Sequence, residues 1–464
     1  MNMTDEKSID GIIADALDVL EKKGIEIESP RILDILSGAG CRIIEENRKG
    51  HRVTVARIPS DLITTSLESA PKMVVLYSTT GELCVTLRNG APAFSTGSSG
   101  RIFCDGRSGN HPSTSADLTK FIKVADFLQH VDMVSTAMVP HDIEPRLQDA
   151  HRLLEVFRNS RKPVITGIYP QAGKNNFERM KDMLLVFRGS GAELRKKPLA
   201  IFDCCPDPLK WSRTLGECLV DCGKYGIPAE IISMPQPGLS FPATLYECVV
   251  QSVAETLAGY VISQTAHPGA PVIWGGSPSS INFERGRMDA ELASPAVMKI
   301  ITAYAAVARR YGLPTHAYAI ADSTVIDAQY GIEKQRSISS AMRAGIDNIT
   351  GMGMYGEEDI LSCESLAVDN DIIGAELYFA KGVRKKRDSL QDIAFLSDEG
   401  VIHPETASFL RSDEHFAPRV FDRDRTKPML DRAIEAVDEI LKKDTRQQIS
   451  EQQLKELEKC LSFK

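Results

Sequence analysis

The sequence of 464 residues lacks the features of membrane, secreted and nucleic-acid-binding proteins. It has no apolar run near the roughly 20 residues that a membrane-spanning helix needs. Its start, MNMTDEKSID, carries acids where a secretory signal carries bases. Its 55 Lys and Arg are interspersed with 63 Asp and Glu, for a net charge of −8 and no long basic stretch. These absences predict a cytoplasmic protein that binds neither membrane nor nucleic acid.

The ten cysteines lack the regular spacing of a disulfide framework. Their one adjacent pair, Cys204 and Cys205, follows a predicted strand, where neighbouring side chains point in different directions. Zinc sites usually combine Cys-x-x-Cys spacing with a second ligand cluster. We therefore expect reduced cysteines and no metal site.

What the sequence does have is a repeated pattern in which proline begins a short apolar run that ends in polar or small residues. Such runs start at Pro163, Pro198, Pro228, Pro271 and Pro314, spaced 30 to 43 residues apart. Proline suits the first position of a strand, where no ladder donor is lost. Each interval has room for one strand, one helix and two loops, so the pattern predicts βα units.

Three further apolar segments, beginning at Ala91, Val131 and Gly345, extend the series to eight strands. Segments with apolar residues three and four apart, such as QDAHRLLEVFRNS and TLYECVVQSVAETLAGYVI, lie between them and predict helices. Eight alternating strands and helices favour an α/β fold of the (β/α)8 TIM barrel type. A doubly wound open sheet is the alternative, but the loops lack its dinucleotide-binding glycine pattern.

The flanks of this region read differently. We expect residues 1–90 to form an N-terminal extension of helix and short strands, residues 91–388 the barrel, and residues 389–464 a C-terminal helical segment. The extension is expected to cap the bottom of the barrel or a contact between subunits.

Catalytic residues of a barrel lie at the carboxyl ends of its strands. The segment HAYAIADSTVIDAQYGIEK, residues 316–334, ends its apolar alternation in acids, a hydroxyl and an amide. Asp322, Ser323 and Gln329 are therefore the predicted catalytic residues. Asp322 could instead cap the following helix.

The other strand ends carry aromatic, thioether and neutral polar side chains, with few bases. Such a lining suits a small cation with an apolar coat, since each cation–aromatic contact contributes about 0.5 to 2 kcal/mol. The predicted substrate-binding residues are Phe94, Tyr169, Phe241, Trp274, His316, Tyr318, Asn348 and Met354. Arg101 and Asp105 lie on the long first loop, where they are expected to form a lid or to contact a partner protein.

Four separated motifs carry a resemblance to a known family. They are MPQPGLSFPATL (234–245), LAGYVISQTAHPGAPVIWGG (257–276), ADSTVIDAQYGIEK (321–334) and AGIDNITGMG (344–353). Together, and in this order, they resemble the trimethylamine methyltransferase family. The resemblance implies a barrel enzyme that passes a methyl group from an amine to the cobalt of a separate corrinoid protein, with no tightly bound cofactor of its own. It also implies a homo-oligomer.

The founding members of that family use pyrrolysine, whereas this sequence contains only standard residues. It therefore resembles the non-pyrrolysine branch, which implies a quaternary amine substrate of the betaine type, such as glycine betaine, proline betaine, carnitine or γ-butyrobetaine. Two other functions stay open: a cofactor-independent barrel lyase or aldolase with Asp322 as its base, and a non-catalytic betaine-binding protein.

Overall fold

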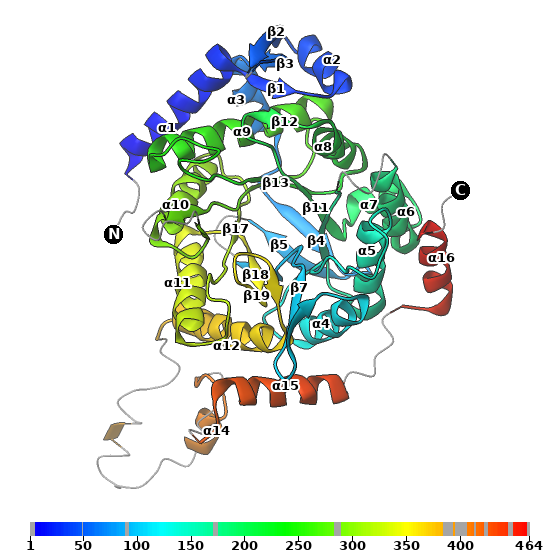
Figure 1. Cartoon of the computed structure of the whole chain (residues 1–464), viewed down its shortest axis with the longest axis vertical. Coiled ribbons are helices and arrows are strands. Elements are labelled where there is room, and N and C mark those ends of the chain that lie inside the picture. The colour runs from blue at the N-terminus through cyan, green and yellow to red at the C-terminus, as the bar shows by residue number, and fades with distance from the viewer. Residues whose placement is uncertain are drawn as a thin grey trace.

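The computed structural model describes residues 5–48, 50–88, 92–169, 175–282 and 289–383, and in the remainder residues 393–394, 406–412, 414–421, 426–443 and 449–461. Within these residues, eight short parallel strands lie inside a ring of helices (Figure 1). The strands are β6 (Ala93–Thr96), β9 (Val134–Ser135), β10 (Val164–Gly167), β11 (Ala200–Cys204), β13 (Ala229–Ser233), β14 (Val272–Gly276), β17 (His316–Tyr318) and β18 (Asn348–Met352). Each lies in a segment that the sequence predicts to be a strand.

The strands pair in the order in which the chain visits them. β9, β10, β11, β13 and β14 form one parallel sheet, and β17, β18 and β6 form another. Parallel bridges between Ser95 and Met133 and between Trp274 and Thr315 connect these two sheets on both sides. The predicted α/β class is therefore confirmed.

One helix follows each strand and packs outside it. These helices are α4 (Ser115–Phe127), α5 (Gln148–Asn159), α6 (Asn176–Arg188), α8 (Arg213–Tyr225), α9 (Leu245–Ala266), α10 (Pro295–Arg310), α11 (Ala328–Ala344) and α12 (Cys363–Ala380). Their starts are fixed by local chemistry: Thr114 and Asp117 form a capping box, and Ser294 caps α10 directly before Pro295. A short α7 (Gly191–Lys196) follows α6.

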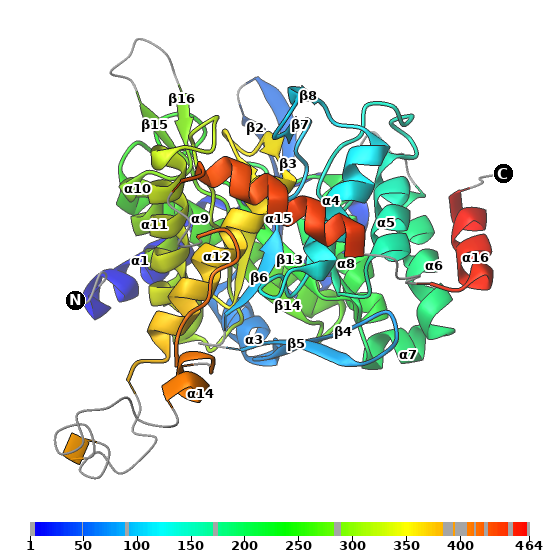
Figure 2. The same cartoon turned by 90° about the horizontal axis from the view of Figure 1, so that it is seen from below.

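A hairpin of β4 (Val74–Tyr77) and β5 (Leu83–Leu87) covers the end where the strands begin (Figure 2). Its inward side chains form a separate apolar cluster with residues near the starts of the parallel strands. The cluster consists of Val74, Leu76, Val85, Leu87, Ala93, Met133, Ile165, Ile201 and Ile273. Because this end is filled by apolar side chains, a functional site is expected at the opposite end.

The opposite end carries hairpins that extend from the carboxyl ends of the strands (Figure 2). The sheet β19-β20-β7-β8 joins the loop after β6 to the loop after β18. Its strands are β7 (Ile102–Asp105), β8 (Gly109–Pro112), β19 (Met354–Tyr355) and β20 (Ile360–Leu361). A second hairpin, β15 (Ser280–Asn282) with β16 (Asp289–Glu291), follows β14.

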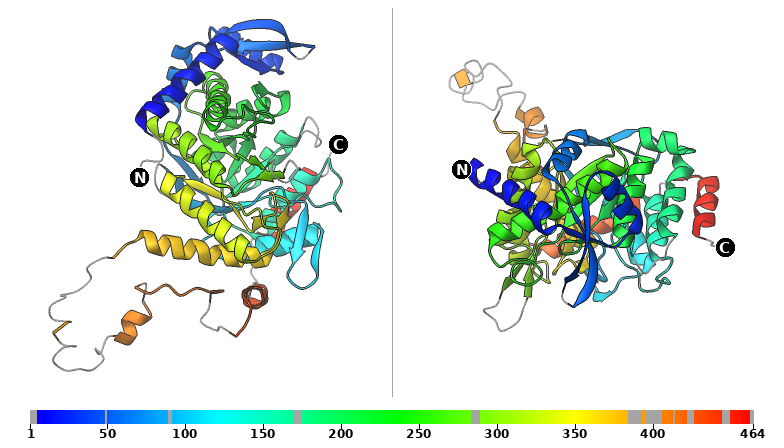
Figure 3. Two further views of the ribbon diagram at one scale, coloured as in Figure 1. Left: turned by 60° about the vertical axis from the view of Figure 1, so that its left-hand side comes forward. Right: turned by 90° about the horizontal axis from the view of Figure 1, so that it is seen from above.

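The N-terminal extension packs on α9 (Figure 3). It contains α1 (Glu6–Asp18) with its π-helical end η1 (Val19–Lys23), β1 (Ile25–Ile27), α2 (Pro30–Gly38), β2 (Arg42–Arg48), β3 (His51–Arg57) and α3 (Ser60–Ser69). β1 also pairs with β12 (Lys210–Trp211) from the loop after β11. Because α9 is covered on both sides, it is apolar around most of its circumference.

The C-terminal segment contributes α14 (Thr406–Leu410), α15 (Met429–Lys443) and α16 (Glu451–Leu461). α15 packs on α12 and α4, and α16 packs on α6 and α5. The boundaries predicted at 90/91 and 388/389 lie outside the described residues. Among the helices that the structure describes, none combines the length and apolar composition needed to cross a membrane.

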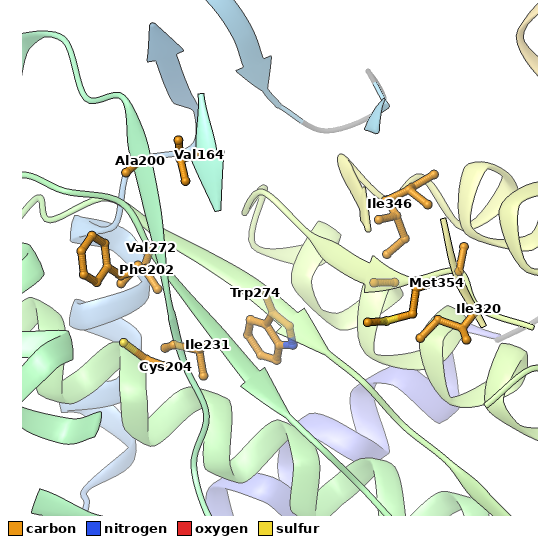
Figure 4. Close-up of a cluster of buried hydrophobic side chains, with 14 of the residues drawn as sticks. Val164, Ala200, Phe202, Cys204, Ile231, Val272, Trp274, Ile320, Ile346 and Met354 are labelled. Carbon is orange, nitrogen blue, oxygen red and sulfur yellow. The ribbon is translucent and has the colours of Figure 1, made fainter. Parts of the chain in front are cut away.

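Side chains along each strand alternate between two environments. Phe202 and Cys204 on β11, Ile231 on β13 and Trp274 on β14 belong to the main apolar core with the surrounding helices (Figure 4). Trp274 packs on Tyr260 of α9 with ring centroids 5.7 Å apart. The residues between them point to the interior of the strand ring.

Candidate functional site

A cavity of about 340 Å³ lies at the carboxyl ends of the strands. The loop or strand end that follows each of the eight strands supplies at least one lining residue. The lining consists of Ser98, Ser99, Thr136, Arg152, Gly167, Ile168, Tyr169, Asp203, Cys205, Leu215, Ile232, Met234, Ser277, Tyr318 and Glu358. Tyr169 and Met234 are 39% and 45% exposed, so apolar side chains reach the outer surface there.

Acidic groups dominate the charge of this cavity. Asp203 and Glu358 line it, and the carboxyl group of Glu230 lies behind Asp203 on the neighbouring strand. Burial raises the pKa of Asp203 to about 7 and the pKa of Glu230 well above its usual range. Burial also raises the pKa of Glu358, while a hydrogen bond from Ser277 Oγ to Glu358 Oε1 (2.7 Å) opposes this.

Beneath Asp203 the interior of the strand ring is polar. Asn348 Nδ2 donates to Glu230 Oε1 (3.1 Å), and Ser95 Oγ donates to Asn348 Oδ1 (3.0 Å). His316 Nε2 lies 3.1 Å from Thr350 Oγ1 and 3.8 Å from Glu230 Oε2. Burial lowers the pKa of His316 to about 3, so the imidazole is neutral and does not balance the charge of Glu230.

One cation, Arg152 of α5, lines the cavity. Its guanidinium donates to the carbonyl oxygen of Thr136 from Nε (2.8 Å) and from Nη2. Nη1 lies 3.7 Å from Asp149 Oδ1, and both side chains are 2% exposed. The Tyr169 ring stacks over the guanidinium at 5.6 Å, and the Tyr169 hydroxyl donates to Ser99 Oγ. Arg152 is therefore fixed in place with one carboxylate beside it.

The structure places the predicted catalytic residues next to the cavity but outside its lining. Asp322 accepts from the backbone N–H groups of Leu292 (2.8 Å) and Ala293 (3.0 Å), and burial raises its pKa to about 6. Ser323 Oγ donates to the Val325 carbonyl, and the exposed Gln329 donates to Glu333. Asp322 thus joins its loop to the segment before α10, Ser323 bonds within the loop, and Gln329 bonds within α11. Their catalytic role stays a prediction.

Two of the predicted substrate-binding residues, Tyr169 and Tyr318, line the cavity together. His316 and Asn348 lie in the polar interior below it. Phe94, Trp274, Met354 and Phe241 are all buried in the main apolar core, Phe241 from the loop after β13. Phe94 and Trp274 occupy strand positions that point toward the helices, so the alternation of the strands separates them from the cavity.

The two predicted loop residues lie on the β7–β8 side of the mouth. Arg101 forms a two-point ion pair with Asp359, from Nε to Oδ1 (2.8 Å) and from Nη2 to Oδ2 (3.1 Å). The ammonium group of Lys120 beside Asp105 (2.8 Å) lowers the pKa of that carboxyl group. Both residues hold loops of this chain in place.

Sequence reasoning missed Arg152, Glu230, Ser277 and Glu358. Glu230 points to the interior of its strand as Asp203 does, and Arg152 lies one turn into a helix whose start faces the cavity. The alternation of strand residues could therefore have identified Glu230, and the position of Arg152 at the start of a helix could have identified Arg152. The position of Glu358 depends on a turn conformation that its sequence does not reveal. No described residues form a group of three or more His, Cys, Asp or Glu side chains placed to hold a metal ion.

The sequence of this chain matches a known protein family. The family model described as trimethylamine methyltransferase (MTTB) matches residues 1–405. The chain belongs to the trimethylamine methyltransferase family. The expected family resemblance is therefore confirmed.

Relatives within the trimethylamine methyltransferase family carry two kinds of name. The trimethylamine methyltransferase of Methanosarcina barkeri is 29% identical over 382 residues, 81% of this chain and 75% of the relative. The glycine betaine methyltransferase of Desulfitobacterium hafniense is 24% identical over 393 residues, 84% and 79% of the two chains. Sequence identity alone therefore does not choose between these substrates.

The fold also has a solved counterpart. The crystal structure of the monomethylamine methyltransferase of Methanosarcina barkeri matches with a TM-score of 0.51, covering 94% of each chain at 10% identity. At this identity the match concerns the fold alone.

Proposed function

We propose that this family member is a (β/α)8-barrel methyltransferase that takes a methyl group from a quaternary amine of the betaine type. The acceptor is Co(I) of a corrinoid carried by a separate protein, and the chain holds no tightly bound cofactor. The two parallel sheets and the bridges that connect them support the barrel. Family membership supports methyl transfer, and the glycine betaine methyltransferase among the relatives supports the substrate class.

The observation that carries the substrate class is the charge balance of the cavity. Asp203, Glu230 and Glu358 have no ion pair with Lys or Arg among the described residues, and the one cation of the lining has Asp149 beside it. Buried carboxyl groups without a counter-charge are costly. A permanently cationic ligand next to aromatic walls supplies that charge without needing a hydrogen bond.

The chemistry of the transfer fits such a ligand. The cobalt nucleophile attacks an N-methyl carbon, the C–N bond breaks, and its electron pair stays on nitrogen, which leaves as a neutral tertiary amine. A quaternary nitrogen already carries the charge that makes it a leaving group, whereas a tertiary amine must first be protonated. Alignment of nitrogen, methyl carbon and cobalt then contributes roughly 7 to 11 kcal/mol.

The substrate's carboxylate has a matching anchor. Arg152 offers guanidinium donors at one side of the cavity, next to the hydroxyl groups of Ser99 and Tyr169. Glycine betaine, proline betaine, carnitine and γ-butyrobetaine all combine a quaternary nitrogen with a carboxylate. An Arg-lined side and an acidic side within one cavity support a zwitterion of this kind. A cytoplasmic location and a homo-oligomeric state stay predictions.

The test is to incubate the purified protein with a corrinoid protein reduced to Co(I) and a panel of quaternary amines, following cobalt methylation by absorbance. We expect methylation by at least one betaine and none by trimethylamine. Methylation by trimethylamine alone contradicts the substrate class, and no methylation by any amine contradicts the function.

A further inference from the structure

The turn that carries Glu358 has an unusual backbone. Gly356, Glu357 and Glu358 follow one another with φ values of 59°, 59° and 66°. Side chains other than glycine rarely adopt this left-handed region, and they do so mostly as single residues. Four non-glycine residues in the described part of the chain have positive φ, and two of them, Ser99 and Glu358, line the cavity. Backbone strain of this kind gathers at functional sites.

Neighbouring contacts force the turn into this conformation. The ion pair between Arg101 and Asp359 clamps the residue directly after Glu358, and the Ile102 N–H donates to the Asp359 carbonyl (2.9 Å). On the other side, the Gly356 N–H donates to the Ala321 carbonyl (2.9 Å). The β7 and β17 segments therefore hold both ends of the turn, and the Glu358 side chain projects into the cavity.

The Glu358 carboxylate has a donor but no counter-charge. Ser277 Oγ donates to Oε1, and no Lys or Arg among the described residues forms an ion pair with Glu358. The charged or titratable groups that interact with it electrostatically or share its cavity are Asp322, Tyr318, Tyr169, Cys205, Asp203 and Arg152. A bound cation would supply the counter-charge that this clamped carboxylate lacks among the described residues.

We propose that Glu358 is the specificity-determining residue for the cationic nitrogen, with its carboxylate against the methyl groups and the strained turn as the structural cost of placing it there. This inference rests on the proposed function and names the residue that distinguishes a quaternary nitrogen from an uncharged group of the same shape. Tyr318, in the same cavity, supplies an aromatic surface for the same methyl groups.

The test compares Glu358→Gln with Glu357→Gln. Glu357 is the exposed neighbour of Glu358 and also has a positive φ. Calorimetry measures the binding of glycine betaine, of tetramethylammonium, and of tert-butylacetate, in which carbon replaces the nitrogen of glycine betaine. Glu358→Gln is expected to weaken both cations about tenfold or more and to leave tert-butylacetate within about twofold. Glu357→Gln is expected to leave all three unchanged.

Two results separate the inference from the proposed function. Wild-type binding of a quaternary ammonium probe that Glu358→Gln leaves unchanged overturns the inference alone, as does equal weakening of the cations and tert-butylacetate. If the wild-type protein binds neither glycine betaine nor tetramethylammonium, the proposed function fails and the inference fails with it.

Thermal unfolding supplies a second readout that a merely structural residue does not give. Glu357→Gly and Glu358→Gly both remove a side chain from a left-handed position, so both are expected to raise Tm. Only Glu358→Gly is expected to lose cation binding. A fall in Tm for Glu358→Gly, with Glu357→Gly raising it, contradicts the strained-turn part of the inference.

Discussion

Asp203 and Glu230 are direct neighbours across strands β11 and β13, and their carboxyl groups share one interior space. Each carboxyl group acts on the pKa of the other, and Asp203 Oδ1 and Glu230 Oε2 are buried without a hydrogen-bond partner among the described residues. A single proton between the two oxygens satisfies both. The pair then carries one negative charge near the cavity instead of two.

The stability of the protein should therefore depend on pH through Asp203. Burial raises its pKa from 3.8 to about 7, so the folded protein keeps the proton more strongly than the unfolded chain. The stability that this proton provides is complete below pH 3.8 and is lost as the pH rises through about 7. Asp203→Asn keeps a donor for Glu230 without titrating. At pH 8 it is expected to be more stable than wild type by roughly 1 to 3 kcal/mol, measured by thermal unfolding.

The control for this prediction is the same comparison at low pH. At pH 3, below the unfolded pKa of 3.8, the two proteins are expected to differ little, because Asp203 is largely protonated in both states of the wild type. A constant difference across the whole range contradicts the shared proton.

Arg152 should control the affinity for the carboxylate of the substrate. Arg152→Met is expected to weaken glycine betaine about tenfold or more and to leave tetramethylammonium, which has no carboxylate, unchanged. Arg158→Met removes an arginine from the outer side of the same helix, where it pairs with Glu155 and Glu458, and serves as the control. Calorimetry measures both affinities. If Arg152→Met weakens the binding of both ligands equally, the cavity wall has collapsed and the prediction is contradicted.

Asp322 should affect the reaction only moderately. Its carboxylate already accepts two backbone N–H groups before α10, and methyl transfer from a quaternary nitrogen needs no general base. Asp322→Asn is expected to lower the single-turnover rate of cobalt methylation by less than about tenfold and to lower Tm. A loss of about a hundredfold or more, typical of a missing general base, contradicts this expectation and assigns Asp322 a direct role in methyl transfer.

A buried ion pair supports the strand ends from outside. Lys334 of α11 lies 3.1 Å from Asp369 of α12, both fully buried, and it also donates to the carbonyls of Ala319 (3.1 Å) and Gly351 (2.6 Å). Lys334→Met is expected to destabilise the protein by about 3 to 5 kcal/mol, because Asp369 keeps a buried charge. Lys22→Met, at the exposed pair with Asp18, is expected to leave the midpoint of the same denaturant titration nearly unchanged.

Strand positions and their order could be predicted from the sequence because proline entry and polar strand ends mark both limits of each strand. The direction of side chains could not, since it depends on which of two alternating phases faces the interior. On β11, Asp203 is the residue that points to the interior. Glu230 is its register partner on β13, so its side chain points to the interior as well. Phe94 and Trp274 have the opposite phase, so two prominent aromatics turn out to be core residues.

The acidic side of the cavity could not be predicted for a different reason. Glu358 reaches the cavity through a left-handed turn held by Arg101 and Asp359, contacts between segments far apart in the sequence. Nothing in the local sequence distinguishes Glu357 from Glu358, although one points to solvent and the other lines the cavity.

The most direct test of a cation-binding cavity is a crystal structure of the protein with glycine betaine bound. The account predicts density inside the cavity with the quaternary nitrogen beside the Glu358 carboxylate and the Tyr318 ring, and the carboxylate at Arg152. Glycine betaine bound with its nitrogen at Arg152, or bound only outside the cavity, would contradict it.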